Sequence, residues 1–328
     1  MNFDVVCLRP EADFERVGVT PPANLSIAYR GPHDSDVASL LQHARALIIP
    51  AVGPRLPADL FNGTALKLVQ VTGAGVDRLD LAALQGLGIP VANVPGGSNS
   101  AVAEYAVTAS SMLLRRFGWA DSELRQGNYV AFRARMVEDN LAGLEGLLVG
   151  IIGFGTVGMS VGRAFYAAGA RLCYFDPAGP NRRTAAELGA RAVFLDELLS
   201  HSDVVTLHLP LVAATRNLIG REQLARMKPG ALLIQASRGG IVDEAALAER
   251  LASGDLGGAA VDVYSTEPPA SDNPLFALKG EAAHRLLLTP HIAGVTRQSW
   301  AFLFRSTWNN IERVLLRGEA PLNQVSGV

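Results

Sequence analysis

A strand that runs into a glycine-rich turn and then into a helix constrains this 328-residue chain more than any other segment. The apolar run Leu147–Ile152 leads into Gly153-Phe154-Gly155-Thr156-Val157-Gly158, and apolar residues at helical spacing follow. In a G-x-G-x-x-G turn the first glycine allows the tight turn, the second lets a ligand approach the backbone, and the third lets helix and strand pack closely. This order of elements predicts a Rossmann βαβ unit that binds a dinucleotide pyrophosphate at the helix N-terminus.

The acid that ends the next predicted strand indicates which dinucleotide binds. Asp176 follows the run Leu172–Phe175, near the roughly 20-residue offset at which a carboxylate meets the adenosine ribose hydroxyls. Because the same carboxylate would repel a 2′-phosphate, the sequence favours NAD over NADP. Arg182 and Arg183 follow shortly afterwards and could meet a phosphate, but two arginines at the start of a helix are more typical of a solvated face.

Short apolar runs alternate with helical stretches along the chain, which predicts βαβ units and mostly parallel sheets covered by helices. The expected strands are Val5–Leu8, Ala46–Ile49, Leu68–Val71, Val149–Ile152, Leu172–Phe175, Val204–Leu209, Leu232–Ile234 and Ala259–Val263. We therefore predict an α/β fold with two Rossmann-like, doubly wound parallel-sheet domains and a cleft between them.

Two segments outside this alternation suggest the domain boundaries. A helix over Ala101–Arg116, with Ser98 or Ser100 as its cap and Glu104 in its first turn, is expected to connect the domains. The last segment, Thr289–Val328, is too short to form a domain alone and should pack on the N-terminal one. The predicted domains are a discontinuous substrate domain, residues 1–100 and 288–328, and an NAD-binding domain, residues 101–287.

Composition excludes several classes of protein. The net charge is -2 and Lys and Arg form no long run, so neither nucleic acid nor an anionic membrane is an expected partner. The longest apolar runs fall far short of the roughly 20 residues that cross a bilayer. Cys7 and Cys173 lie far apart, so we expect two buried thiols in a reducing compartment and no metal site. The N-terminus enters an apolar strand without a signal-type segment, which predicts a cytoplasmic location.

Seven short motifs follow one another along the chain, and both their residues and their order are typical of one family of enzymes. They are Val71-Thr72-Gly73-Ala74-Gly75-Val76-Asp77, Asn93-Val94-Pro95-Gly96, Gly153 to Gly158, Ser237-Arg238-Gly239-Gly240-Ile241-Val242-Asp243-Glu244, Val261-Asp262-Val263-Tyr264, Glu267-Pro268-Pro269 and Thr289-Pro290-His291-Ile292-Ala293-Gly294. From about Leu66 to about Trp308 the chain resembles the D-isomer-specific 2-hydroxyacid dehydrogenases, which include D-lactate, hydroxypyruvate/glyoxylate and phosphoglycerate dehydrogenases. The resemblance implies an NAD-dependent oxidoreductase that interconverts a small D-2-hydroxy acid and its 2-keto acid. It also implies a homodimer formed through the Ala101–Arg116 helix and its flanking loops.

Arg238 is the expected ligand of the substrate carboxylate. It follows the strand Leu232–Ile234 at its carboxyl end, the edge at which open α/β sheets bind ligands, and a guanidinium suits bidentate capture of a carboxylate. A lone arginine there would be a structural ion pair about as often as a ligand. The pair Gly239-Gly240 favours the ligand role, because it would clear space for a ligand beside the backbone.

His291 and Glu267 are the expected acid–base pair. Imidazole is the group best matched to exchanging a proton near neutral pH, and His291 stands in a turn after Pro290. By sequence alone Glu267 could be a surface acid, but the resemblance pairs it with His291, where its charge would orient the ring and favour the protonated form. The other histidines are expected to be surface, packing or structural residues: His33, His43, His201, His208 and His284.

The resemblance also implies the remaining contacts. Asp262 ends an apolar run where a charge needs a partner, and it is expected to meet the nicotinamide carboxamide. The expected cofactor-binding residues are Val102, Gly153, Gly155, Thr156, Val157, Gly158, Asp176, Leu209, Pro210, Thr215, Ala236, Ser237, Arg238, Asp262, His291 and Gly294. The expected substrate contacts are Ala74 and Gly75, through their backbone N–H groups, with Arg238 and His291.

The chain departs from the family pattern in a few places. Thr156 stands where Arg, Asn or His is common, so a side-chain contact to the pyrophosphate should be weaker, and Arg78 stands where Asn is common, which alters the substrate-side loop. The chain ends without an added regulatory domain, so feedback control by that route is not expected. Pocket size should depend on loops near Arg30, Val52–Arg55 and Ala74 and on Arg133 or Arg135, and the sequence does not name the substrate.

Two other functions fit parts of the sequence. An NAD(H)-sensing, corepressor-like binding protein would share the fold, but it would be expected to carry a peptide-binding surface and extended tails. A formate or phosphonate dehydrogenase variant would share the cofactor domain. The intact set of Arg238, Glu267 and His291 argues against formate.

Overall fold

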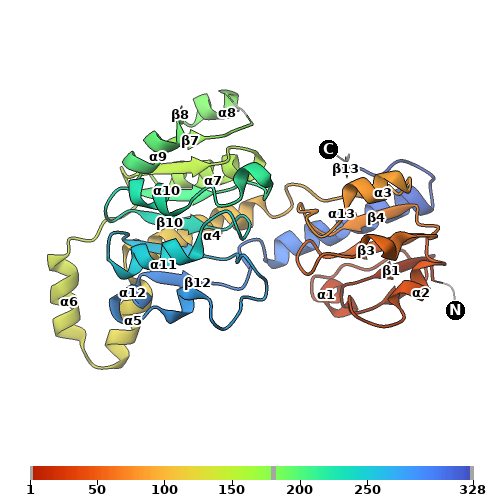
Figure 1. Ribbon diagram of the computed structural model, residues 1–328, viewed down its shortest axis with the longest axis horizontal. Helices are drawn as coiled ribbons and strands as arrows, with labels where there is room; N and C mark the ends of the chain where they lie inside the picture. Colours follow the sequence, from red (N-terminus) through yellow and green to blue (C-terminus); the bar gives the residue numbers. More distant parts are fainter. Residues whose placement is uncertain (1–2, 179–181, 326–328) are drawn as a thin grey trace. The chain divides into compact units, whose positions relative to one another are not determined.

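The computed structural model describes residues 3–178 and 182–325, and the chain divides into two compact units. The first unit comprises Met1–Ser98 with Val295–Val328, as far as these are described, and the second comprises Asn99–Gly294 (Figure 1). No helix among the described residues is both long and apolar enough to cross a membrane.

The first unit is built on a sheet of six strands in the order β13-β5-β4-β3-β1-β2. The strands are β1 (Val5–Cys7), β2 (Ile27–Tyr29), β3 (Ala46–Ile49), β4 (Leu68–Val71), β5 (Val91–Ala92) and β13 (Gln324–Val325). All pairs are parallel except β13 with β5, and the order of β1 to β5 is that of a flavodoxin-like doubly wound sheet. The helical segments of this unit are α1 (Glu11–Glu15), α2 (Val37–Leu41), η1 (Ala58–Phe61), α3 (Leu81–Gly86) and α13 (Arg297–Leu315).

The C-terminal helix α13 completes the core of the first unit. Phe304 and Trp308 of α13 are buried against Phe14, with ring centroids 4.5 and 5.5 Å apart, and α13 packs on β3 and β4. Asn310 donates a buried hydrogen bond of 2.8 Å to Gln70 of β4. These contacts hold the end of the chain to a sheet made from its beginning.

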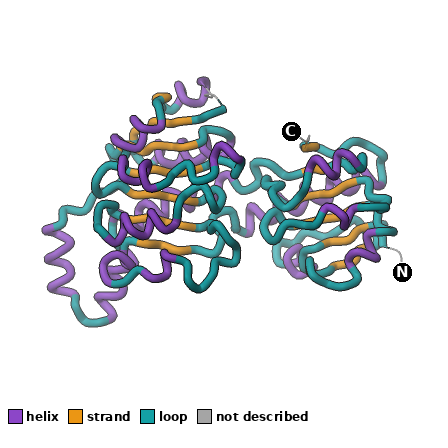
Figure 2. Tube along the Cα trace, in the orientation of Figure 1, coloured by secondary structure: helices purple, strands orange, loops and turns teal. Residues whose placement is uncertain are grey.

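The second unit contains a sheet of seven strands, all parallel, in the order β12-β11-β10-β9-β6-β7-β8. Figure 2 shows strands of this sheet, in orange, side by side among purple helices. The strands are β6 (Leu148–Ile152), β7 (Arg171–Phe175), β8 (Arg191–Ala192), β9 (Val204–Leu207), β10 (Leu232–Gln235), β11 (Gly258–Val261) and β12 (Leu286–Leu288). The order reverses between β6 and β9, as in a Rossmann sheet, and both units are therefore doubly wound, which confirms the predicted fold class.

Helices cover both faces of this second sheet. They are α4 (Asn99–Leu114), α5 (Phe117–Arg125), α6 (Tyr129–Glu138), α7 (Thr156–Ala167), α8 (Arg182–Glu187), α9 (Leu195–His201), η2 (Ala213–Thr215), α10 (Arg221–Arg226), α11 (Glu244–Ala252), η3 (Pro274–Ala277) and α12 (Gly280–His284). Two apolar layers enclose the sheet, one under α4 and α7 and the other under α9, α10 and α11.

The start of α4 differs from the prediction. The helix begins at Asn99, so Ser98 directly precedes it, whereas Ser100 lies inside it. Its first turn contains no acid, because Glu104 stands further along. The reason is burial: Ala101, Val102 and Ala103 are already packed in the core of the second unit, so the chain is helical as soon as it enters that unit.

The strands predicted from apolar runs are present, with ends shifted by at most two residues. The five strands that the sequence did not reveal, β2, β5, β8, β12 and β13, are only two or three residues long. Runs this short carry too little periodicity to be recognised. Both cysteines are buried and unpaired, as expected.

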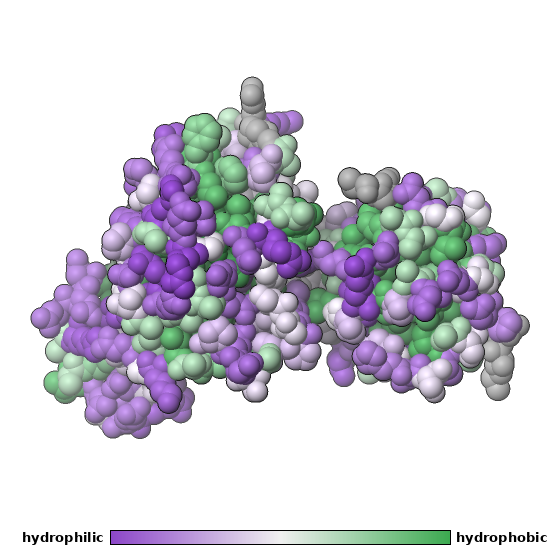
Figure 3. All heavy atoms as spheres, viewed as in Figure 1, coloured by the Kyte–Doolittle hydropathy of each residue, from purple (hydrophilic) through white to green (hydrophobic). Residues whose placement is uncertain are grey.

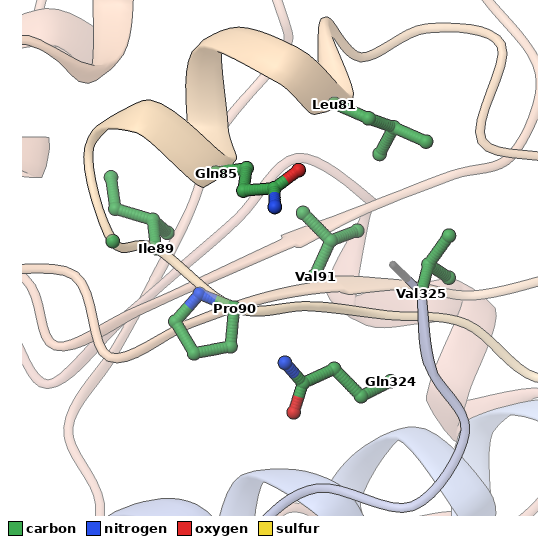
Figure 4. Close-up of a pocket in the computed structure, with 8 residues that line it drawn as sticks. Leu81, Gln85, Ile89, Pro90, Val91, Gln324 and Val325 are labelled. Atoms are coloured by element: carbon green, nitrogen blue, oxygen red, sulfur yellow. The ribbon is translucent and has the colours of Figure 1, made fainter. Parts of the chain in front are cut away.

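A pocket in the first unit lies between α3 and the strand pair β5 and β13 (Figure 4). It is lined by Leu81, Gln85, Gly88, Ile89, Pro90, Val91, Gln324 and Val325. None of the residues predicted to bind cofactor or substrate lines this pocket.

Candidate active site

The residues predicted to bind cofactor gather at one edge of the second sheet. Because its strands are parallel, their carboxyl ends share an edge, and most of the predicted residues follow directly after β6, β7, β9, β10, β11 or β12. Val102 lies in the first turn of α4. Ala74 and Gly75 follow β4 at the corresponding edge of the first unit, where Ala74 is exposed.

The glycine turn between β6 and α7 requires its glycines for measurable reasons. Gly153 has a φ of 91°, and a Cβ there would lie 2.6 Å from the carbonyl oxygen of His208. A Cβ on Gly158 would lie 2.0 Å from the carbonyl oxygen of Gly153, so the start of α7 can approach the turn only without a side chain.

Gly155 has a different role in the same turn. It is the N-cap of the 12-residue helix α7, it makes no side-chain cap, and nothing lies within 4 Å of a Cβ built on it. The space beside this N-cap is therefore open, and the first N–H groups of a helix, which lack partners within the helix, lie at this end with the positive end of the helix dipole. This arrangement fits the pyrophosphate of a dinucleotide.

Asp176 connects the end of β7 to this turn. Its Oδ2 accepts a 2.7 Å hydrogen bond from the N–H of Phe154, and its Oδ1 accepts one of 2.9 Å from the N–H of Ala178. The carboxylate is only partly buried, as a ligand of ribose hydroxyls should be. Arg183 pairs with Glu187 and is 92% exposed, whereas the side chain of Arg182 lies outside the described residues.

Side chains after β9 are turned into the loop rather than toward a ligand. The Thr215 hydroxyl donates to the carbonyl of Pro210 at 2.6 Å and accepts from the N–H of Val212 at 2.8 Å. Leu209 and Thr215 are buried. These positions therefore have mainly backbone groups to offer a cofactor.

Arg238 stands in a turn that is braced by the last residue of β10. Gln235 donates from Nε2 to the carbonyl of Arg238 and accepts from the hydroxyl of Ser237, both at 2.8 Å. One guanidinium nitrogen of Arg238 donates to the Ser237 carbonyl at 2.8 Å. The turn thus fixes where the Arg238 side chain leaves the sheet edge.

Gly239 is required for a reason that the sequence did not reveal. A Cβ on it would lie 1.7 Å from the carbonyl oxygen of Tyr264, so this glycine makes room for the backbone after β11. The prediction was that the pair Gly239-Gly240 clears space for a ligand; at Gly239 the backbone after β11 fills that space instead.

His291 and Glu267 are in direct contact. Nδ1 of His291 lies 2.8 Å from Oε2 of Glu267, and Oε1 of Glu267 accepts from the N–H of Tyr264 at 3.1 Å. Burial raises the pKa of Glu267, but the hydrogen bonds from His291 and Tyr264 and the charges of His291 and Arg238 outweigh it, so the net pKa lies below the usual value. Glu267 is therefore an anion at neutral pH.

Asp262 holds the segment that carries His291. Its carboxylate accepts from the hydroxyl of Thr289 at 2.6 Å and from the N–H groups of Ile292 and Ala293 at 2.8 Å each. Its carbonyl accepts from the N–H of His291, also at 2.8 Å. His291 has a φ of 55°, a left-handed conformation that is costly for a residue with a side chain, and these bonds compensate for it.

Because of this network, the second domain boundary lies later in the chain than predicted. The sequence placed residues 288–328 with the first domain, whereas residues up to Gly294 belong to the second unit. The cause is the set of bonds from Thr289–Ala293 to Asp262, together with the pairing of β12 with β11. His291 is consequently a residue of the second unit.

Sequence reasoning missed two hydroxyl groups in this network. The Tyr105 hydroxyl on α4 lies 2.8 Å from Oγ1 of Thr289, and the Tyr264 hydroxyl donates to the carbonyl of Thr289 at 3.0 Å. Burial raises the pKa of Tyr105 to about 12, and burial also raises the pKa of Asp262 despite its three donors. A buried aspartate at a strand end signalled that donors were needed, but not which ones.

Comparison with known proteins bears on this geometry. The model of the D-isomer specific 2-hydroxyacid dehydrogenase NAD binding domain matches residues 107–293. The chain belongs to the D-isomer specific 2-hydroxyacid dehydrogenase family. It carries that family's NAD-binding domain, and the matched range contains the glycine turn, Asp176, Arg238, Glu267 and His291.

Individual members of this dehydrogenase family are similar over most of the chain. The (S)-sulfolactate dehydrogenase of Chromohalobacter salexigens is 38% identical over 250 residues, which cover 76% of this chain and 78% of that protein. The D-3-phosphoglycerate dehydrogenase of Archaeoglobus fulgidus is also 38% identical, over 71% of this chain but only 42% of that protein. The chain spans about half the length of the phosphoglycerate dehydrogenases that it matches.

A solved structure extends the similarity to the whole fold. The NAD-dependent formate dehydrogenase of Staphylococcus aureus, determined in complex with NAD, is 27% identical with a TM-score of 0.81. The similarity covers 98% of this chain and 99% of that one.

Proposed function

We propose that the protein is an NAD-dependent oxidoreductase that interconverts a small D-2-hydroxy acid and its 2-keto acid. The observation that carries the proposal is the 2.8 Å contact between His291 Nδ1 and Glu267 Oε2, at the sheet edge that also bears Arg238 and the glycine turn. A histidine paired with an anion in this way is suited to exchange a proton with a reacting oxygen.

In this proposal, different residues of the second unit bind the substrate and transfer the proton. When bound, NADH supplies the hydride for C2 of the keto acid. Arg238 binds the substrate carboxylate through its planar guanidinium. His291 donates a proton to the oxygen on C2 during reduction and accepts it during oxidation. Because Nδ1 faces Glu267, Nε2 is the ring nitrogen left for the substrate.

Glu267 acts through His291. Its lowered pKa keeps it ionised at neutral pH, and a negative charge beside the ring stabilises the protonated imidazole that reduction consumes. From the first unit, we propose that the N–H groups of Ala74 and Gly75 also bind the substrate carboxylate. That assignment rests on the family resemblance of the segment Val71–Asp77.

Asp176 is the proposed determinant of cofactor choice. Its two oxygens already fix the backbone of Phe154 and Ala178, so the carboxylate is held rigidly at the end of β7. A 2′-phosphate at that place would meet a fixed negative charge, which favours NAD over NADP.

A screen of NADH oxidation tests the proposed activity. Wild type and His291→Ala are compared on glyoxylate, hydroxypyruvate, pyruvate, phenylpyruvate and 3-phosphohydroxypyruvate, with sulfolactate and formate added in the NAD-reducing direction. Turnover of one or more keto acids by wild type, largely lost in the variant, supports the proposal. Turnover of formate alone supports the formate dehydrogenase alternative, and NADH binding without turnover supports a sensing protein.

We also propose a homodimer formed through α4 and the segments beside it, including the helices α5 and α6 that follow it. Trp119 of α5 stacks on His284 at 5.1 Å and meets Phe132 of α6 at 5.3 Å, which fixes α5 and α6 to α12. Beyond this anchor Val130 is 80% exposed and Val137 is 65% exposed. Figure 3 shows hydrophobic and hydrophilic side chains mixed on this surface.

Oligomeric state can be measured directly. Sedimentation of wild type should give a dimer, and Val130→Asp should shift the protein toward monomer. Phe194→Asp, at an exposed residue outside α5 and α6, serves as the matched control. The two buried, unpaired cysteines fit the reducing environment of the cytoplasm, which is the location we propose.

A further inference from the structure

Arg78 is a buried cation in the first unit that no carboxylate compensates. Its residue is 3% exposed, and among residues 3–178 and 182–325 no acidic side chain forms an ion pair with it. The other arginines after strands of this sheet edge are paired: Arg9 with Asp13, Arg30 with Asp36 and Arg55 with Asp80. Burial of a charge without a partner is costly, and folded chains tolerate it mainly where something else is gained.

The guanidinium of Arg78 binds backbone carbonyls of another loop instead. Nε donates to the carbonyl of Pro54 at 2.8 Å and Nη1 to that of Pro50 at 2.9 Å. These two carbonyls lie at the ends of a five-residue segment that follows β3, so one rigid fork spans the segment. Nη2 is buried without a hydrogen-bond partner among the described residues, so the hydrogen bonds that the guanidinium makes all go to this loop.

Three further observations show that the loop after β3 packs closely on the segment after β4. The N–H of Leu56 donates to the carbonyl of Arg78 at 2.8 Å. Gly53, with a φ of 130°, lies so close that a Cβ on it would be 3.2 Å from Cζ of Arg78. A Cβ on Gly73 would be 2.8 Å from that of Ala51, so the two backbones approach closely there as well.

The clamped loop and its neighbour carry exposed groups at the sheet edge. Val52 to Arg55 are exposed, and the segment after β4 presents Ala74, also exposed, and Gly75. Under the function proposed above, Ala74 and Gly75 bind the substrate carboxylate, so the loop held by Arg78 lies next to that end of the substrate.

We propose that Arg78 is a positioning residue for substrate selection, which clamps the loop of residues 50–56 beside Ala74 and Gly75. Its fork geometry, not its charge alone, is what the site uses. Lysine carries the same charge but cannot span two carbonyls with a planar pair of donors, and asparagine or glutamine is uncharged and offers a single amide nitrogen. The inference rests on the proposed function for its substrate half only.

The test uses the full chain with Arg78→Gln and Arg78→Lys. Arg45→Gln is the matched control, because Arg45 precedes β3 at the opposite edge of the same sheet and donates to the Leu315 carbonyl at 2.6 Å. Pro50 and Pro54 have no N–H, so hydrogen exchange of the loop is read at residues 51–53, 55 and 56, above all at Leu56, whose N–H donates to the Arg78 carbonyl. In the NAD-free protein, exchange should accelerate at least about tenfold in both Arg78 variants and not in Arg45→Gln. KM for the best keto acid should rise about tenfold or more, with a smaller change in kcat and an unchanged Kd for NADH.

Several outcomes would overturn the inference. Unchanged exchange over residues 50–56 in folded Arg78→Gln would show that Arg78 does not hold the loop. A KM in Arg78→Lys equal to that of wild type would show that the charge, and not the fork geometry, is what matters. An equal rise in KM in Arg45→Gln reduces the effect to general loosening. If Arg78→Gln does not fold, Gly53→Ala provides a second variant: its Cβ would lie 3.2 Å from Cζ of Arg78 and displace the guanidinium, and it should produce the same exchange and KM changes. A wild type that binds NADH but reduces no keto acid contradicts the proposed function and the substrate half of this inference, whereas the exchange measurement still decides the clamp.

Discussion

The carboxyl edges of the two sheets satisfy their buried charges in opposite ways. In the second unit Asp262 is 1% exposed and receives three donors from the segment that carries His291. In the first unit Arg78 is 3% exposed and has two carbonyls, no acid among the described residues, and one unused nitrogen. At the edge of the second sheet the buried charge is fully hydrogen-bonded. At the edge of the first sheet Arg78 holds a loop in place, and its Nη2 makes no hydrogen bond among the described residues.

Under the proposed function, this contrast means different tasks for the two units. The completed network would hold His291, the proposed proton donor, in one geometry, as a chemical step requires. Arg78 would hold an exposed loop in place without touching the reacting atoms. We therefore expect changes in the second unit to act on kcat and cofactor binding, and changes at Arg78 to act on KM and substrate choice.

The largest effect is expected from His291→Ala. Loss of the proposed proton donor should lower kcat by roughly 10² to 10⁴. The Kd for NADH should stay nearly unchanged, because Nδ1 of the ring faces Glu267 and Nε2 is the atom proposed to face the substrate. Stopped-flow turnover and NADH fluorescence titration measure the two quantities. Near-normal turnover in the variant would break the assignment of the chemistry to the second unit.

Gly158→Ala should be the next most damaging change. The added Cβ would overlap the carbonyl oxygen of Gly153 at 2.0 Å, and overpacking of this kind costs about 1 to 3 kcal/mol. Thermal unfolding should show a lower Tm together with weaker NADH binding. Gly155→Ala is the control, since open space surrounds its Cβ: it should weaken NADH binding with little change in Tm. Equal losses of Tm in both variants would show that any added side chain destabilises the turn, whatever space surrounds it.

Thr289→Val tests whether the network under His291 is complete. It removes a donor to Asp262 at 2.6 Å and a partner of Tyr105 at 2.8 Å, which should cost about 1 to 3 kcal/mol of unfolding free energy. Urea denaturation measures the loss, and kcat should fall with it because His291 loses its support. A stable variant with normal kcat would mean that Asp262 is anchored well enough by the backbone alone.

The smallest effect concerns the cofactor. Catalytic efficiency with NADH should exceed that with NADPH by at least about tenfold, roughly 1.4 kcal/mol, because Asp176 opposes a 2′-phosphate. Asp176→Asn keeps the side-chain shape and should narrow the ratio. Equal efficiency in wild type would instead point to arginines near the start of α8 as phosphate ligands.

The sequence predicted the second unit better than the first, and the reason lies in what its motifs encode. The glycine turn is recognisable because Gly153, Gly155 and Gly158 stand at a fixed spacing between a strand and a helix, and Gly158 is required by Gly153 of the same turn. Gly239 was misinterpreted because its neighbour, Tyr264, comes from another strand end. The boundary near Leu288 was misplaced for the same reason, since Asp262 precedes Thr289 by 27 residues.

Arg78 shows the limit in the first unit. Its identity was visible as a departure from the family pattern, but its partners Pro50 and Pro54 lie 28 and 24 residues earlier in a loop without regular structure. No periodicity or motif links such positions. Only the folded chain brings them together.

The pH dependence of keto-acid reduction in Glu267→Gln tests the central claim most directly. The pKa of Glu267 lies below its usual value in the folded protein, so its charge is present at all pH values above that lowered pKa and is lost only as the pH falls through it. Above that range the carboxylate holds the His291 ring through the 2.8 Å contact with Nδ1, and glutamine keeps the shape but removes the charge. The variant should therefore reduce keto acids more slowly, by about tenfold for each 1.4 kcal/mol of lost interaction, and it should lack the decline in rate that wild type shows as the pH falls through the lowered pKa of Glu267. A variant whose rate matches that of wild type at neutral pH, or whose rate declines over the same acid range, would contradict the account.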